Sequence, residues 1–305
     1  MLRDREALSL RIETLTLQGT TEWNEDALVI NEALGLYGVL DGATSLQPYR
    51  GPNGETGGYL ASRTLKQFFE DLTVEDTASD SLLPYVVEAN RRLRRQMAEA
   101  GIDTNRKDAL WTSALAVIRV RDRYIDYAQV GDCMIIAQYE DGTIRVLSRD
   151  QVAHMDKISK NAREEGIRQG FTTREQLWDI VKPILLNNRT QMNTIEGYSV
   201  MSGEPEVADF IEYGRINRIR LKSLLLVTDG LFLPSDGGAE GEGASPVGGR
   251  HADAYAELLS RIVQSSLETY ARKLMQLESE DKECQRYPRF KVSDDKTAIW
   301  IQFLG

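Results

Sequence analysis

Acidic residues stand at the ends of several apolar runs in this 305-residue chain. They follow a run at Asp41, Asp132 and Asp229, and they precede one at Glu25-Asp26 and at Asp294-Asp295. If these strand ends converge, several carboxylates lie close together, and like charges that close disfavour joint ionisation. A bound divalent cation would remove that conflict, and two cations would remove it better.

The residue types available for a metal site are mainly carboxylates. The chain has only two histidines, His154 and His251, so a site built on imidazole is not expected. Carboxylate oxygens favour hard cations such as Mg²⁺ or Mn²⁺. Gly42 follows Asp41 directly, and a glycine allows its backbone carbonyl to turn towards a metal.

A plainer interpretation of each motif stays open at this point. An Asp-Gly pair after a strand is commonly an ordinary turn. Asp141-Gly142 lies between two short apolar runs and predicts a β-hairpin turn. Spacing along the chain does not by itself establish that the acidic strand ends converge.

Composition limits the functional classes. The net charge is −10, with 41% hydrophobic and 28% charged residues, which is typical of a globular protein and gives no basic footprint for nucleic acid. The basic cluster at 91–95 lies in a helical pattern and is interpreted as a solvated helix face. The sequence shows neither an apolar stretch of membrane-spanning length nor a signal-peptide pattern. We therefore expect a cytoplasmic protein without nucleic-acid or membrane partners.

Hydrophobic periodicity predicts the elements that must position these residues. Strands are expected at 7–15, 27–30, 35–40, 112–120, 123–130, 133–139, 143–148, 206–212, 218–228 and 296–303. Helices are expected at 57–72, 81–100 and 252–280, and a polar helical segment at 152–190. Short gaps within the block at 112–148 predict antiparallel pairing of successive strands.

This order predicts an α+β layered fold in a single domain over 1–305, with two antiparallel sheets covered by helices. The segment at 234–250 is rich in glycine and is interpreted as a flexible loop.

The ordered set of motifs resembles the metal-dependent protein phosphatase family, type 2C. The motifs are Asn24-Glu25-Asp26, Tyr37-Gly38-Val39-Leu40-Asp41-Gly42, Gly57-Gly58-Tyr59-Leu60-Ala61-Ser62, Trp111-Thr112-Ser113-Ala114, Val130-Gly131-Asp132-Cys133, Val227-Thr228-Asp229-Gly230-Leu231-Phe232 and Asp294-Asp295-Lys296-Thr297-Ala298. The order of the set, rather than any one motif, makes the resemblance specific. It implies a four-layer α/β/β/α sandwich with metals at one end and a helical flap insert at 151–203.

The resemblance also implies a role for each acidic residue. Asp41 would bridge two Mn²⁺ or Mg²⁺ ions, and the carbonyl of Gly42 would bind one of them. Asp229 and Asp294 would complete the pair, so that Asp41, Asp229 and Asp294 form the catalytic set. Glu25 and Asp26 would act mainly through metal-bound waters, and Asp132 matches the position of a weaker third cation in bacterial members.

The implied activity is hydrolysis of phosphoserine and phosphothreonine in proteins. A water between two divalent cations has a lowered pKa and supplies hydroxide at neutral pH for in-line attack on phosphorus. The partner would be a phosphorylated protein substrate, and we expect a monomer.

The sequence departs from the family pattern at three positions. Thr21 stands where many members have an arginine that binds the substrate phosphate, and Arg50 or Arg63 are candidates to replace it. Ala43 stands where many have a histidine that protonates the leaving group, and Leu233 replaces a further acidic ligand. Two alternatives therefore stay open: a non-enzymatic regulatory module on the same fold, and a phosphatase of small phosphate esters.

Overall fold

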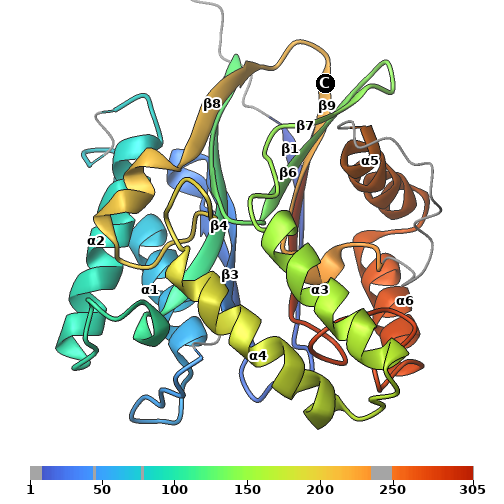
Figure 1. Ribbon diagram of the computed structural model, residues 1–305. Helices are drawn as coiled ribbons and strands as arrows, with labels where there is room; N and C mark the ends of the chain where they lie inside the picture. The colour runs from blue at the N-terminus through green and yellow to red at the C-terminus, as the bar shows by residue number, and fades with distance from the viewer. Residues whose placement is uncertain (1–8, 44–45, 77–78, 235–248, 305) are drawn as a thin grey trace, which may run out of the picture.

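Two antiparallel five-stranded sheets face one another at the centre of the protein (Figure 1). The computed structural model describes residues 9–43, 46–76, 79–234 and 249–304. The first sheet has the order β2 (Asp26–Asn31), β3 (Leu36–Ala43), β4 (Thr112–Val120), β5 (Tyr124–Val130) and β8 (Glu212–Asn217). The second has the order β1 (Leu10–Leu17), β10 (Lys296–Phe303), β9 (Leu221–Val227), β6 (Met134–Tyr139) and β7 (Ile144–Val146).

The central strands are apolar on both faces, which explains their nearly unbroken apolar sequences. In β9, Leu224 and Leu226 pack in the core between the two sheets. Leu225 and Val227 point the other way, into a core beneath helices. The alternation of a pleated strand therefore fills two separate cores from one run.

Helices cover the outer face of each sheet and complete four layers (Figure 1). Helices α1 (Gly57–Asp71) and α2 (Leu83–Glu99) cover the first sheet. Helices α5 (Gly249–Gln264) and α6 (Leu267–Ser279) cover the second. The predicted α/β/β/α sandwich is confirmed.

The segment predicted as a helical insert, 151–203, contains the helical hairpin α3 (Ala153–Arg168) and α4 (Arg174–Thr190). The hairpin lies across one end of the two sheets (Figure 1). Thr173 begins α4 with a reciprocal capping box, in which its side chain accepts from the amide of Gln176 and the Gln176 side chain accepts from the amide of Thr173.

One pairing prediction was wrong. Successive strands β5 and β6 do not pair, because they belong to different sheets. Gly131 lies between them at a φ of 84°, in the left-handed region that favours glycine. The short turn there takes the chain from one sheet to the other and leaves Asp132 at their common end.

Two element boundaries also differ from prediction. Residues 206–212 form mainly a 3₁₀ helix, Pro205–Asp209, because proline at the first position favours a helical turn; strand β8 begins only at Glu212. The single helix expected at 252–280 is two helices, since the Ser266 side chain accepts from the amide of Thr269 and begins α6 anew. The glycine-rich segment predicted as a flexible loop falls, over 235–248, outside the described residues.

Candidate metal centre

Asp26 and Asp41 form a cross-strand pair at one end of the first sheet. They stand directly opposite one another in the antiparallel register of β2 and β3. The next pair of the same parity, Leu28 and Val39, contacts the core between the two sheets. Both carboxylates therefore point into the space between the sheets, with their β-carbons about 5 Å apart.

The second sheet brings Asp229 and Asp294 to the same end. Asp229 follows β9, and Asp294 stands two residues before β10, which pairs with β9 in antiparallel register. The two sheets are joined here by Thr228, whose hydroxyl donates to Asp26 Oδ2 at 2.8 Å. A side-chain hydrogen bond also links Asp229 to Asp41. Four predicted aspartates from two sheets thus converge.

The pKa values of these carboxyl groups are raised because the groups are buried and lie close together. Burial raises the pKa of Asp41 well above its usual value, and the charges of Asp26 and Asp229 raise it further. Burial and Asp294 act in the same way on the pKa of Asp26. Burial and Asp294 raise the pKa of Asp229 to about 6, although its hydrogen bond with Asp41 acts in the opposite direction. This is the conflict among close carboxylates that a cation relieves.

Asp132 joins the cluster from the turn between β5 and β6. Its pKa is raised first by burial, then by Asp229, and then by Asp150 and Asp156. Asp150 precedes α3 and accepts from the amides of Val152 and Ala153 at 3.0 and 2.8 Å. Asp132 therefore lies between the central aspartates and a second acidic group at the start of α3.

Glu25 and Gly42 lie in a crowded corner beside the pair. The amide of Gly42 donates to the carbonyl of Glu25 at 3.2 Å. A β-carbon on Gly42 would lie 2.2 Å from the carbonyl oxygen of Gly58, so only glycine fits. The Glu25 carboxylate accepts a short hydrogen bond from the hydroxyl of Thr56, the residue that caps α1.

Asp295 has a different environment from its neighbour Asp294. Its two carboxylate oxygens accept from the amides of Gly19 and Glu25, each at 2.7 Å. It thereby ties the segment before β2 to the segment before β10. The different roles of Asp294 and Asp295 were not predicted from the sequence.

The donor set suits a hard divalent cation, because it consists of carboxylate oxygens and backbone carbonyls. Within the described residues, no three acidic, histidine or cysteine side chains are drawn together closely enough to form a preformed metal cage. Coordination by three or more of them therefore requires their side chains to move closer together. The crowding at Gly42 also suits a cation site, because it fixes the position of the backbone carbonyl next to Asp41.

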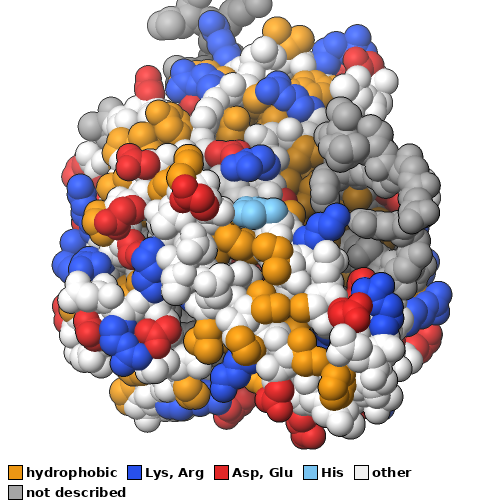
Figure 2. Space-filling view, viewed as in Figure 1, with side chains coloured by type: hydrophobic (Ala, Val, Ile, Leu, Met, Phe, Trp, Pro, Cys, Tyr) orange, Lys and Arg blue, Asp and Glu red, His pale blue; other side chains and the backbone are white. Residues whose placement is uncertain are grey.

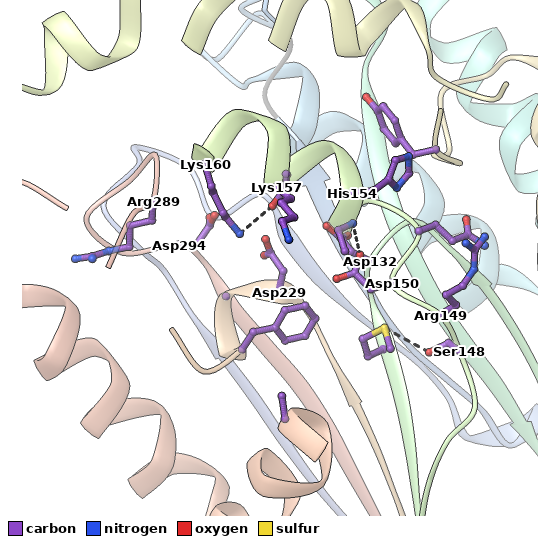
Figure 3. Close-up of a pocket in the computed structure, with 18 of the residues that line it drawn as sticks. Asp132, Ser148, Arg149, Asp150, His154, Lys157, Lys160, Asp229, Arg289 and Asp294 are labelled. Carbon is purple, nitrogen blue, oxygen red and sulfur yellow. Dashed lines mark hydrogen bonds and ion pairs between the residues drawn. The ribbon is translucent and has the colours of Figure 1, made fainter. Parts of the chain in front are cut away.

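A cavity of about 1970 Å³ opens beside this centre, between the sheet ends and helix α3. Figure 3 shows Asp132, Asp150 and Asp229 facing one space, with Lys157 and Lys160 above them on α3. Basic residues of the cavity wall were not singled out from the sequence as part of the site. They come from α3 and from the 281–295 segment, and they include Lys157, Lys160, Arg289 and Lys291. Asp156 and Lys160 form an ion pair at the i,i+4 spacing of a helix face. That spacing could have indicated from the sequence that charged residues share one face of this helix.

The positions that depart from the family pattern are placed as follows. The Thr21 hydroxyl donates to the carbonyl of Trp23 at 2.8 Å. The guanidinium of Arg63 donates to the backbone carbonyls of Asp26 and Asn24, and Arg50 forms a surface ion pair at 3.6 Å with Glu22.

The other two departures are Ala43 and Leu233. Ala43 ends β3 and is exposed. His154 is exposed in the first turn of α3 and lines the cavity, and Leu233 also lines it.

The fold of this chain is similar to that of solved bacterial serine/threonine phosphatases. The chain is similar to a bacterial serine phosphatase, with a TM-score of 0.56 at 16% identity over 97% of this chain and 99% of that chain. It is similar to the serine/threonine phosphatase Stp1 from Staphylococcus aureus, with a TM-score of 0.56 at 16% identity over 97% and 96% of the two chains.

A further similarity is to the serine/threonine phosphatase PstP/Ppp of Mycobacterium tuberculosis, with a TM-score of 0.53 at 16% identity over 97% of this chain and 99% of that chain. No curated protein gives a significant sequence match. The family model of protein phosphatase 2C matches residues 19–278. The chain therefore belongs to the protein phosphatase 2C family. None of the described helices is long and apolar enough to cross a bilayer.

Proposed function

We propose that this protein is an active metal-dependent phosphatase that hydrolyses phosphoserine and phosphothreonine in proteins. The observation that carries the proposal is the convergence of Asp26, Asp41, Asp229 and Asp294 from two sheets on one place, where Asp26 is buried and the other three are partly exposed. Holding that many carboxylates close together is unfavourable unless cations offset their charges. A solved relative, the catalytic domain of PstP, is described in complex with two manganese ions.

In the proposed assignment, Asp41 would hold both cations, and Asp229 and Asp294 would each hold one of them. The Gly42 carbonyl would be a further ligand, since Gly42 is fixed by the contacts that exclude a β-carbon. Glu25 and Asp26 would act through bound waters, because the Glu25 carboxylate accepts from Thr56 and the Asp26 carboxylate accepts from Thr228. Asp132 lies where a third cation would be shared with Asp150 and Asp156.

Two Mn²⁺ or Mg²⁺ ions held there would supply an activated water and offset charge on the phosphoryl oxygens. The side chains themselves have two tasks. The aspartates would fix the cation positions, and the wall of the cavity would orient the phosphate. The described chain needs no side-chain nucleophile for this chemistry.

A second candidate is a regulatory module on the same fold, and two observations favour it. Thr21 stands at the position where the resemblance implies a phosphate-binding arginine, and its hydroxyl donates to the backbone carbonyl of Trp23. The leaving-group acid is absent at Ala43. A module of this kind would bind metal but release no phosphate.

Hydrolysis of a panel of substrates distinguishes these functions. Phosphothreonine and phosphoserine peptides and a small sugar phosphate are offered to the wild type and to Asp229→Asn at saturating Mn²⁺. We expect phosphate release from the peptides that the variant lacks. Release from the sugar phosphate alone indicates a small-ester phosphatase. No release at all, with manganese bound in calorimetry, indicates a regulatory module.

A further inference from the structure

Lys291 forms an ion pair with the acidic centre itself. Its Nζ lies 2.7 Å from Asp294 Oδ1, and its side chain is 34% exposed and lines the cavity. The ammonium is therefore held at the cavity, in direct contact with a carboxylate of the centre.

The loop that carries Lys291 is organised by Arg289. All five guanidinium hydrogens of Arg289 donate to acceptors in the loop or at the end of α6. They bind the Asp281 carboxylate and the backbone carbonyls of Glu278, Asp281, Tyr287 and Val292, at 2.7 to 3.0 Å. Arg289 is thus a scaffold for the loop, and Lys291, two residues later, is placed at the cavity by it.

This loop lies against the segment where the family pattern expects an arginine. The amide and hydroxyl of Thr20 both donate to the carbonyl of Ser293, at 3.0 and 3.1 Å. The amide of Gly19 donates to Asp295. The loop that carries Lys291 is therefore in direct contact with the segment that contains position 21, and Lys291 stands two residues before Ser293.

Three other cations, two of which are the candidates named from the sequence, are occupied differently. Arg63 binds two backbone carbonyls and stacks on Tyr59, with its guanidinium 4.6 Å from the ring centre. Arg50 is paired at the surface with Glu22. Lys160 on α3 is paired with Asp156 at 3.2 Å and is the rival to be tested.

We propose that Lys291 binds the substrate phosphate in this site, in place of the arginine absent at position 21. The proposal rests on the proposed phosphatase function. An ammonium has three donors on one point, so Nζ can keep Asp294 Oδ1 and also donate to a phosphoryl oxygen. Both described donors to Asp294, Lys291 Nζ and the amide of Asp295, use Oδ1, which leaves Oδ2 as the oxygen for a cation.

Calorimetric binding of inorganic phosphate to the Mn²⁺-loaded chain tests the proposal. The proteins are the wild type, Lys291→Met, Lys291→Arg and the rival Lys160→Met, and Mn²⁺ affinity is measured on each. We expect Lys291→Met to weaken phosphate binding roughly tenfold to a hundredfold, the usual contribution of a charged hydrogen bond. Lys291→Arg and Lys160→Met should stay near the wild type, and Lys291→Met should still bind Mn²⁺.

Four results would overturn the proposal: Lys291→Met binding phosphate like the wild type, Lys160→Met losing phosphate instead, the wild type binding no phosphate, and Lys291→Met losing Mn²⁺. The last would mean that Lys291 only organises Asp294. Lys291-dependent phosphate binding without hydrolysis of any ester would leave this proposal standing and contradict the proposed phosphatase activity.

Discussion

Asp26 and Asp41 face each other across strands β2 and β3, and both point into the space between the two sheets. The register of these two strands by itself places two carboxylates side by side, and Asp229 and Asp294 come to the same end from the other sheet. Mutual repulsion within this group opposes folding when the carboxylates are ionised. Metal binding and stability are therefore coupled.

The first prediction concerns the pH dependence of stability in chelator. A carboxyl group with a raised folded-state pKa stabilises the protein below its unfolded pKa of about 3.9, and this stabilisation is lost as the pH rises through the folded pKa. Because Asp229 has a pKa raised to about 6 and Asp26 and Asp41 are raised as well, the melting temperature should fall between about pH 5 and about pH 7.

The control for this prediction is Asp229→Asn, which removes one of the repelling charges and should show a shallower fall. Saturating Mn²⁺ should remove most of the fall in the wild type. A melting temperature that rises with pH over this range, by the same amount in both proteins, would contradict the electrostatic description of the centre.

A second prediction concerns the buried ion pair behind the site. Lys296 is fully buried, and its Nζ donates to Glu278 Oε2 at 2.8 Å and to the carbonyl of Asp294 at 3.0 Å. Lys296→Met leaves the Glu278 charge unpaired and should lower the free energy of unfolding by about 3–5 kcal/mol. Urea denaturation measures it.

The double variant Lys296→Met/Glu278→Leu removes both charges of this pair. It should be more stable than Lys296→Met alone, because no uncompensated charge remains. A single variant that costs less than about 1 kcal/mol would show that the pair is not desolvated in solution.

A third prediction concerns Asp295, the residue that ties Gly19 and Glu25 to the start of β10. In Asp295→Asn, the amide group cannot accept from both backbone N–H groups, so we expect a loss of about 1–3 kcal/mol and weaker Mn²⁺ binding. The matched control is Asp141→Asn, in an exposed turn where the side chain accepts from the amide of Thr143. Calorimetry and thermal melting that do not separate the two variants would argue against the tethering role.

A fourth prediction follows from Ala43. Without a general acid beside the centre, a poor leaving group loses about two to four orders of magnitude in rate. Aryl phosphates, whose leaving group needs no protonation, should therefore be hydrolysed much faster than phosphothreonine peptides. Equal kcat/KM values at saturating metal would mean that another group, with His154 the first to test, protonates the leaving oxygen.

Much of the fold was readable from the sequence because the apolar runs are long and the turn residues are clear. Asp141-Gly142 forms the turn of the hairpin between β6 and β7 as predicted, with Gly142 at a φ of 86°. The separation of β5 and β6 was not readable, because a short gap with one glycine fits both a hairpin and a change of sheet. The break at Ser266 was hidden, since apolar periodicity continues on both sides of it.

The candidate site was readable only in its acidic part. Aspartates at strand ends carry a positional signal, whereas Lys291 lies in an irregular loop whose course is set by the five hydrogen bonds of Arg289. Such a contact between distant segments leaves no periodic pattern. The expected cytoplasmic location and monomeric state stay predictions.

Mn²⁺-dependent hydrolysis of para-nitrophenyl phosphate by the wild type and by Asp41→Asn shows whether the acidic centre holds catalytic cations. Asp41 is the carboxylate assigned to both cations, and the substitution keeps its size. We expect turnover by the wild type that is abolished by chelator and by the substitution. Turnover that survives both, or a manganese-loaded wild type without turnover, would contradict this expectation.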